Sequence, residues 1–387
     1  MKIGIACGGT GGHIFPGLAT AEVLREQGHE VVLWMGGKDI EKKALGGWPG
    51  PVITVQSMGL PSRPGIKYIS AFLMNWRAFL RCRRQMRFSP PNVFLAMGGY
   101  ASVAPVMAAV SLSIPVVLHE ANVIPGRANR FLSRFAQVFA LGFEETRSHI
   151  RHRKMIYTGI PLRKTNTQNK LSAADSAEVT GASDSGRRRA EWNVLRTDVF
   201  TILAMGGSRG ASRLNEIVTK AVVNLHAEKK GKTVQIIHLT GTEDEISVRK
   251  TYLESGVIHL VFAFLHNMDQ AYRQTSLAIC RAGGSTCAEI AKFGVPALLV
   301  PYPHATSNHQ MANARAVASA GAADVIEEKN CTADWLAAYI FALMADNDKL
   351  QRMKNAALKR ADRACPSSAR DAASALADLT LSITRRT

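Results

Sequence analysis

The chain opens with KIGIACGGTGGHIFPGLATAEVL (Lys2–Leu24), and this stretch decides the fold class. A short apolar run is followed by glycines and then by apolar residues at helical spacing. We therefore expect a strand over Lys2–Ala6 and a helix over Phe15–Gln27 that ends at Gly28. A second stretch, VFTILAMGGSRGASR (Val199–Arg213), repeats this order. The sequence predicts a duplicated α/β architecture, in which two doubly wound, parallel-sheet (Rossmann-like) domains face each other across a cleft.

Further short apolar runs predict strands in both halves of the chain. They are Val31–Met35, Val52–Gln56, Val93–Met97, Val116–Leu118 and Gln137–Leu141, then Val199–Ala204, Val234–Leu239, His259–Ala263, Leu277–Cys280 and Ala297–Pro301. Segment 164–190 is too poor in apolar residues to bury a core, so we expect a flexible linker or surface insertion there. We place the first domain at 1–162 and the second at 163–364. Alanine and leucine at helical spacing over Ser367–Ser382 predict a closing helix.

The composition is that of a globular protein with a large positive charge. Hydrophobic residues make up 47% of the 387 residues, and the net charge is +18 at pH 7. Such an excess favours acidic partners, namely nucleic acid, anionic lipid or phosphorylated ligands. No RNP, KH or helix-turn-helix signature is present, so nucleic acid is not expected. The six cysteines show no C-x-x-C spacing and indicate buried thiols in a reducing cytoplasm rather than a zinc site.

Two segments could be mistaken for export or membrane signals. The first ten residues lack a charged n-region and run at once into glycines, so no signal peptide is expected. Gly98–Leu118 is uncharged and long enough to span a bilayer. Because Pro105, Pro115 and three serines interrupt it, we expect a glycine loop, a short helix and a strand there instead.

The first glycine loop, Gly8–His13, favours an anion at the start of a helix, since glycines let backbone N–H groups approach a ligand closely. The dinucleotide fingerprint is absent, because its third glycine would fall at Ile14 and the next strand ends in Met35-Gly36-Gly37 without an acidic residue. A tight turn with no ligand is the alternative. A histidine beside such a loop can take a proton from an alcohol, so His13 is either a candidate base or a structural histidine.

Two further glycine loops, Met97–Tyr100 and Gly206–Gly210, also follow predicted strands. Ser208 and the amides of its loop can bind phosphate. A fourth cluster, Cys280–Glu289 (CRAGGSTCAE), joins a strand to a helix whose N-terminus favours a diphosphate. Glu289 lies about one turn into that helix. Its carboxylate could accept hydrogen bonds from the two ribose hydroxyls, or it could cap the helix.

In their order and spacing these motifs resemble one family. GGTGGHIFPGLA, LAMGGYASVAP, HEANVIPGRANR, GIPLR, MGGSRGA and CRAGGSTCAEIAKFGVPALLVPYP are similar to the motifs of the MurG family. Its members are peptidoglycan enzymes that transfer N-acetylglucosamine from UDP-N-acetylglucosamine to lipid I. The resemblance covers nearly all of the chain except 164–190. It implies the two-domain GT-B fold, with the C-terminal helix, 365–387 here, returning to the N-terminal domain.

The resemblance also implies roles for single residues. His13 is the candidate base, and Tyr100, His119 and Glu120 lie on the acceptor side. The donor contacts are Thr10, Gly11, Gly12, Asn122, Arg163, Ser208, the backbone at Leu265, Gly284, Ser285, Thr286, Cys287, Ala288, Glu289 on the ribose, and Gln310. The family often has GYVSGP where this chain has GYASVAP, and the spacing after Pro301 leaves His309 as an alternative to Gln310.

The reaction implied is an inverting direct displacement. His13 takes the proton of the acceptor's 4-hydroxyl, the oxygen attacks the anomeric carbon, and UDP leaves as a β-1,4 link forms. Loop amides and helix N-termini hold the leaving diphosphate, and no metal or other cofactor is expected, since no D-x-D stands at a strand end. The alternatives are a related UDP-sugar-dependent glycosyltransferase that acts on a diacylglycerol-type lipid, and a nucleotide-binding module without catalysis.

The segment Ile66–Phe88, IKYISAFLMNWRAFLRCRRQMRF, predicts an amphipathic helix. Large aromatic residues lie on its apolar face, and Arg81, Arg83, Arg84 and Arg87 crowd one end. These features favour attachment to an anionic membrane surface. An ordinary crossover helix that packs on the sheet is the alternative. The expected location is the cytoplasmic face of the bacterial inner membrane, with peripheral attachment.

Overall fold

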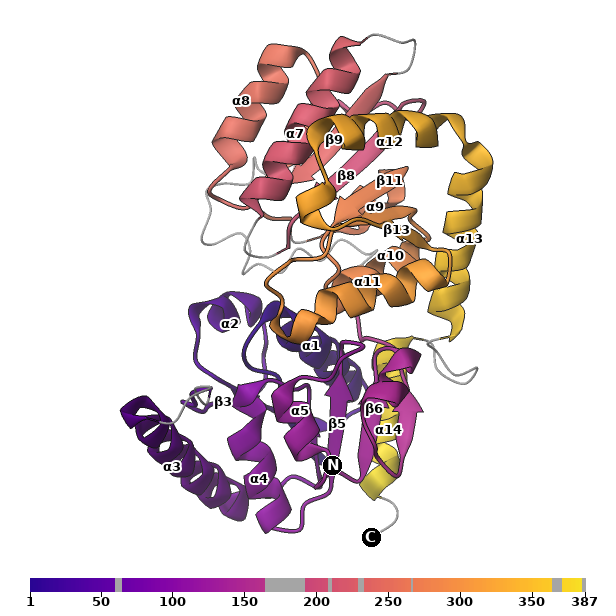
Figure 1. Ribbon diagram of the computed structural model, residues 1–387. Helices are drawn as coiled ribbons and strands as arrows, with labels where there is room; N and C mark the ends of the chain where they lie inside the picture. Colours follow the sequence, from indigo (N-terminus) through magenta and orange to yellow (C-terminus); the bar gives the residue numbers. More distant parts are fainter. Residues whose placement is uncertain are drawn as a thin grey trace. The chain divides into compact units, whose positions relative to one another are not determined.

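The computed structural model describes residues 1–59, 65–163, 192–207, 211–228, 233–265, 267–363 and 371–384. The chain forms two compact units (Figure 1). Unit 1 comprises Met1–Lys164 and Arg363–Thr387, and unit 2 comprises Thr165–Asp362. The predicted insertion at 164–190 and Ser208 lie outside the described residues. Each unit has its own sheet and core.

Unit 1 is built on a seven-stranded parallel sheet in the order β3-β2-β1-β4-β5-β6-β7. The strands are β1 (Lys2–Ala6), β2 (Glu30–Met35), β3 (Val52–Thr54), β4 (Val93–Ala96), β5 (Val116–Glu120), β6 (Val138–Leu141) and β7 (Met155–Tyr157). β4 and β5 are buried along their whole length, as expected where helices cover both faces of a parallel sheet. The strand order reverses between β1 and β4, and at such a switch point a ligand can bind beyond the strand ends.

Helices cover both faces of the unit 1 sheet. They are α1 (Gly11–Glu26), α2 (Asp39–Ala44), α3 (Ile66–Phe88), α4 (Val103–Ser111), α5 (Arg127–Leu132) and α14 (Ala372–Thr384), with the 3₁₀ helices η1 (Tyr100–Ser102) and η2 (Glu144–His149). One core joins the sheet to α1 and α14 through residues such as Leu18 and Leu376. A second core joins the other face to α3 and α4 through Met86 and Val106. The C-terminal helix thus completes the unit that the N-terminus begins.

Unit 2 is built on a six-stranded parallel sheet in the order β10-β9-β8-β11-β12-β13. The strands are β8 (Phe200–Met205), β9 (Val234–Leu239), β10 (Ile258–Phe262), β11 (Leu277–Cys280), β12 (Ala297–Leu299) and β13 (Ala323–Val325). The helices are α7 (Ser212–Ala227), α8 (Glu245–Ser255), α9 (Asp269–Gln274), α10 (Gly284–Phe293), α11 (His309–Ser319), α12 (Ala333–Ala345) and α13 (Asn347–Arg363), with η3 (Thr306–Asn308) and η4 (Glu328–Asn330). The order reverses between β8 and β11.

Two Rossmann-like parallel sheets are present, as the sequence predicted. The short strands β7 and β13 were not predicted, because three residues are too few to show a period. α1 begins at Gly11, earlier than predicted, because the first N–H groups of a helix need no intrahelical partner and glycines can occupy its first turn. Over Gly98–Leu118 the structure has η1, α4 and β5, as expected. No described helix is long and apolar enough to cross a membrane.

Candidate active site

The switch point of the unit 1 sheet carries the predicted base. His13 lies in the first turn of α1, where its N–H donates to the Thr10 carbonyl oxygen at 2.9 Å. Its Nδ1 lies 3.2 Å from Thr10 Oγ1. The imidazole also packs against the loop after β4, since a Cβ on Gly99 would lie 3.3 Å from His13 Cε1. The half-buried ring is therefore held between the two loops of the switch point while part of it stays accessible.

A buried carboxylate that sequence patterns do not reveal shapes this glycine loop. Glu41, in α2, is 1% exposed, and its Oε1 accepts a hydrogen bond from the Gly9 N–H at 2.7 Å. Its Oε2 accepts from the N–H groups of Gly37 at 2.6 Å and Lys38 at 3.2 Å. An acidic residue therefore does follow the glycines after β2, but it binds the protein's own backbone. The only local signal for it is a glutamate a few residues beyond a glycine pair.

His119 lies at the carboxyl end of β5 and is fully buried. Its Nε2 is 2.9 Å from the Gly159 carbonyl oxygen, and because a carbonyl only accepts, Nε2 carries the proton. Nδ1 is then an acceptor without a partner among the described residues. Burial lowers the pKa of His119 to about 4, the Gly159 hydrogen bond opposes this, and the neighbouring His13 lowers it slightly further. The imidazole is neutral at pH 7 and points into the unit.

Glu120 organises the loop that follows β5. Its Oε1 accepts hydrogen bonds from the backbone and side-chain N–H groups of Asn122, both at 3.0 Å. Its Oε2 accepts from the Gly126 N–H and from Asn129 Nδ2, again at 3.0 Å. Burial raises the pKa of Glu120, and these hydrogen bonds oppose the rise. The structure therefore gives this carboxylate a loop-shaping role that the sequence did not predict, and it places Asn122 in the same network.

Tyr100 and Arg163 also lie in unit 1. Tyr100 begins η1 directly after the β4 loop, and Lys38 Nζ lies 5.2 Å from its ring centroid. Arg163 Nη2 donates to the Ala44 carbonyl oxygen at 3.0 Å, and its guanidinium lies 4.5 Å over the Phe15 ring. Burial lowers the pKa of Arg163. These contacts are with α1 and α2, so a contact between Arg163 and the nucleotide stays a prediction.

The switch point of the unit 2 sheet leads from β11 into α10. Gly283 caps this helix in an extended conformation, and Gly284 begins it. Ser285 Oγ, in the first turn, is buried and has no hydrogen-bond partner among the described residues. An unpaired hydroxyl at a helix N-terminus suits a ligand oxygen that carries negative charge. Thr286 and Ala288 are half-buried in the same helix.

Cys287 and Glu289 lie further along α10. Cys287 is buried, and burial raises the pKa of its thiol to about 12, so the side chain is inert. Glu289 Oε2 accepts a hydrogen bond from Tyr272 Oη at 2.8 Å. Burial raises the pKa of Glu289 to about 7, against the opposing effects of Tyr272 and Lys292. This hydrogen bond joins Glu289 to a buried tyrosine of α9 and not to the helix end, and the helix has no side-chain cap, so the capping alternative has no support.

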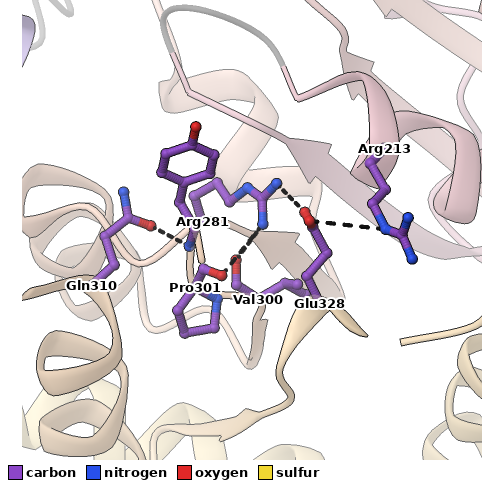
Figure 2. Close-up of polar contacts among 7 residues, drawn as sticks. Arg213, Arg281, Val300, Pro301, Gln310 and Glu328 are labelled. Atoms are coloured by element: carbon purple, nitrogen blue, oxygen red, sulfur yellow. Dashed lines mark hydrogen bonds and ion pairs between the residues drawn. The ribbon is translucent and has the colours of Figure 1, made fainter. Parts of the chain in front are cut away.

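Gln310 is tied to the segment that follows β12. Its Oε1 accepts a hydrogen bond from the Tyr302 N–H at 2.9 Å (Figure 2). His309, the alternative to it, has Nδ1 at 2.8 Å from the Thr306 carbonyl oxygen. Leu265 is half-buried in the loop after β10. Gln310, His309 and Leu265 therefore all follow the carboxyl ends of unit 2 strands. Among the described residues no group of His, Cys, Asp and Glu could hold a metal ion.

Comparison with known proteins adds a family to this geometry. Residues 3–140 match the glycosyltransferase family 28 N-terminal domain, and residues 201–367 match its C-terminal domain. A relative from Geobacter sulfurreducens, named UDP-N-acetylglucosamine--N-acetylmuramyl-(pentapeptide) pyrophosphoryl-undecaprenol N-acetylglucosamine transferase, is 36% identical over 391 residues and covers 100% of both chains. A relative of the same name from Anaeromyxobacter sp. is 36% identical over 92% of this chain and 88% of its own.

Solved structures agree with the sequence comparison. The crystal structure of MurG from Acinetobacter baumannii is similar with a TM-score of 0.73 and 26% identity, over 99% of this chain and 100% of that one. A UDP-GlcNAc 2-epimerase from Neisseria meningitidis, bound to UDP-GlcNAc, has a TM-score of 0.64 at 12% identity over 100% of both chains. At that identity the likeness shows the fold alone.

Proposed function

The chain belongs to glycosyltransferase family 28, among the MurG enzymes, and on this basis we propose how its residues carry out sugar transfer. The protein is an N-acetylglucosaminyltransferase that uses UDP-N-acetylglucosamine and lipid I, the lipid-linked N-acetylmuramoyl-pentapeptide of peptidoglycan synthesis. The fold is of the GT-B type. We propose that unit 2 binds the donor UDP-N-acetylglucosamine and that unit 1 carries the catalytic base.

The observation that carries the donor assignment is the N-terminus of α10. It combines the unpaired Ser285 hydroxyl with N–H groups that have no intrahelical acceptor, which suits a diphosphate. Glu289 lies on the same helix with one oxygen on Tyr272, which leaves the other to accept hydrogen bonds from ribose hydroxyls. Gln310 and the backbone at Leu265 would complete the donor contacts. These roles would stabilise UDP as the leaving group without a metal ion.

His13 is the better candidate for the base of the two histidines at this edge of unit 1. His119 is fully buried, and its Nε2–H is engaged by Gly159, so it could reach a substrate hydroxyl only after rearrangement. His13 is partly accessible and sits at the switch point. We propose that it takes the proton from the acceptor's 4-hydroxyl, which then displaces UDP with inversion. Tyr100 and the Glu120 loop would line the acceptor side.

Attachment to the membrane is the second part of the proposal, and it rests on α3. The small residues Ala71, Ala78 and Cys82 of this helix pack inward, whereas Phe72 and Trp76 are 55% and 52% exposed. Met86 is buried in the core and Phe79 packs against it, but the other large apolar side chains described on this helix face away from the sheet. This disfavours the ordinary crossover helix as the explanation of the exposed face. The other exposed apolar residues on the helix are Tyr68, Ile69, Leu73, Met74, Leu80 and Phe88.

Arginines at the end of α3 complement this apolar face. Arg81, Arg84 and Arg87 are exposed, and Arg83 is half-buried. Anionic headgroups would attract each exposed one by about 1 kcal/mol. We propose reversible attachment at the cytoplasmic face of the bacterial inner membrane. Replacing the four arginines with glutamine should reduce co-sedimentation with anionic vesicles and leave donor binding unchanged. Equal binding of the wild-type chain to neutral and anionic vesicles would contradict this proposal.

The transferase activity is tested by the release of UDP. We expect release that requires both UDP-N-acetylglucosamine and a lipid I analogue, with the labelled sugar recovered on the lipid. A related enzyme for diacylglycerol-type lipids would instead release UDP with diacylglycerol. A nucleotide-binding module would bind UDP and release none with either lipid.

A further inference from the structure

Unit 2 contains a buried guanidinium directly after β11, the strand that leads into the proposed donor-binding helix α10. Arg281 directly follows β11, and its side chain is 9% exposed. Its Nη1 donates to the Val300 carbonyl oxygen at 3.1 Å and makes a longer contact of 3.5 Å to that of Pro301 (Figure 2). Its backbone N–H points to the Met205 carbonyl oxygen at 3.4 Å. This one residue therefore connects the ends of β8, β11 and β12.

Glu328 supplies the charge that balances this guanidinium. Its carboxylate, in η4 after β13, accepts a hydrogen bond from Arg281 Nη2, and its side chain is only 11% exposed. The other carboxylate oxygen lies 3.9 Å from Nε of Arg213, which is 64% exposed in the first turn of α7. Figure 2 shows Glu328 between the two arginines. The buried partner is the stronger of the two, because an exposed pair at that distance contributes little.

The contacts of Arg281 continue to the predicted donor residue Gln310. The guanidinium lies 5.5 Å from the ring centroid of Tyr302. The N–H of Tyr302 in turn donates to Gln310 Oε1. The segment between them contains Ser307 and Asn308 with φ of 53° and 54°, conformations that non-glycine residues keep only when their surroundings hold them. The contacts of Tyr302 and Gln310, which flank this segment, therefore decide its conformation.

We propose that Glu328 is a positioning residue for the UDP-sugar site. Its carboxylate holds Arg281 on the end of β12, and Arg281 thereby holds Tyr302 and Gln310 in the conformation that binds the donor. Without the negative charge, the buried guanidinium would turn towards water and release the Val300 carbonyl. This inference rests on the proposed function of unit 2 as the donor-binding unit. Glu328 itself need not touch the donor.

The test is Glu328→Gln, measured by calorimetry with UDP-N-acetylglucosamine. We expect the donor Kd and KM to rise on the order of tenfold, equivalent to about 1.4 kcal/mol, with kcat nearly unchanged. Asp198→Asn is the matched control, because Asp198 is an exposed carboxylate that also pairs with an arginine of unit 2, Arg196. Should Glu328→Gln fail to fold, Glu328→Asp applies the same test, since it keeps the charge but withdraws it from Arg281.

A double-mutant cycle separates positioning from general destabilisation. If Glu328 acts through Gln310, Gln310→Ala should weaken donor binding less in the Glu328→Gln background than in the wild type. Glu289→Ala should weaken binding equally in both. Donor binding by Glu328→Gln that equals that of Asp198→Asn, or full additivity with Gln310→Ala, would overturn the inference while leaving the donor site intact. A wild-type chain that does not bind UDP-N-acetylglucosamine would instead overturn the proposed function.

Discussion

The two glycine-rich helix starts, before α1 in unit 1 and before α10 in unit 2, look alike in sequence but differ in what occupies them. Before α1, the Gly9 N–H and the neighbouring loop are bound by the buried carboxylate of Glu41. At α10, the Ser285 hydroxyl is buried and unpaired. A carboxylate already on a loop disfavours a second anion there, whereas the start of α10 favours one. A glycine-rich turn therefore predicts a close backbone, and side chains from elsewhere decide whether it binds a diphosphate.

The largest expected effect concerns the catalytic side of this comparison. His13→Ala should lower kcat by about 10²–10⁴-fold, the range for loss of a general base, with donor affinity little changed. Steady-state rates with a lipid I analogue and calorimetry with UDP-N-acetylglucosamine measure the two quantities. His29→Ala, a histidine of the same unit beside the N-terminus, is the control. Turnover of His13→Ala within about threefold of the wild type would place the base elsewhere.

Glu41→Gln should have the next largest effect. Both carboxylate oxygens of Glu41 accept hydrogen bonds from backbone N–H groups, and the side-chain NH₂ group of glutamine cannot accept one of these. We expect kcat to fall on the order of 10²-fold as His13 shifts. The free energy of unfolding should fall by about 1–3 kcal/mol from the unpaired buried N–H. Glu30→Gln, at an exposed glutamate paired with Lys2, is the matched control. An unchanged kcat would show that the Glu41 contact does not position the base.

Glu289→Ala tests the donor side. Loss of a charged partner for the ribose hydroxyls should weaken binding of UDP-N-acetylglucosamine by about 1–3 kcal/mol, with the fold retained. Calorimetry measures it, and His13→Ala serves as the control at the other helix start. If affinity is unchanged, Glu289 serves only to hold Tyr272.

Donor affinity should also depend on pH through Glu289. Its pKa is raised to about 7, and the ionised form is the better acceptor for hydroxyl groups. The ionised fraction falls roughly tenfold between pH 8 and pH 6, so the donor Kd should rise by up to about that factor as pH falls. UDP-N-acetylglucosamine is the suitable probe, because its diphosphate has no group that titrates near neutrality. Glu289→Gln should abolish the dependence, and a dependence that persists would point to another group.

The smallest effect is expected from removing most of the insertion that the sequence predicts at 164–190. Deletion of 165–186, which lies outside the described residues, should leave activity and folding nearly unchanged, because its composition offers no core and a long loop costs little to close. Soluble yield and the rate of UDP release measure this. Loss of soluble protein on deletion would contradict the expectation.

Most of the fold could be predicted because its signals are local. Apolar runs of the central strands are continuous, as buried parallel strands require, and glycines mark where each strand turns into a helix. The edge strand β13 escaped prediction because Ala323–Val325 carries an aspartate and is too short to show a pattern. On α3 the pattern predicted the apolar stripe correctly. Only the structure shows that alanines, a cysteine and Met86 face the core, whereas Phe72 and Trp76 face outward.

The sequence by itself determined the family, the two parallel sheets, the glycine turns at their switch points, and the candidates His13 and Glu289. It could do so because strand, turn and helix each depend on neighbouring residues. Tertiary structure alone decided which distant side chains reach those turns. Glu41 meets Gly9 across 32 positions and Glu328 meets Arg281 across 47. Such contacts form only once each sheet has assembled. The order of the strands in the sheet, and not distance along the chain, brings the carboxyl ends of the strands together.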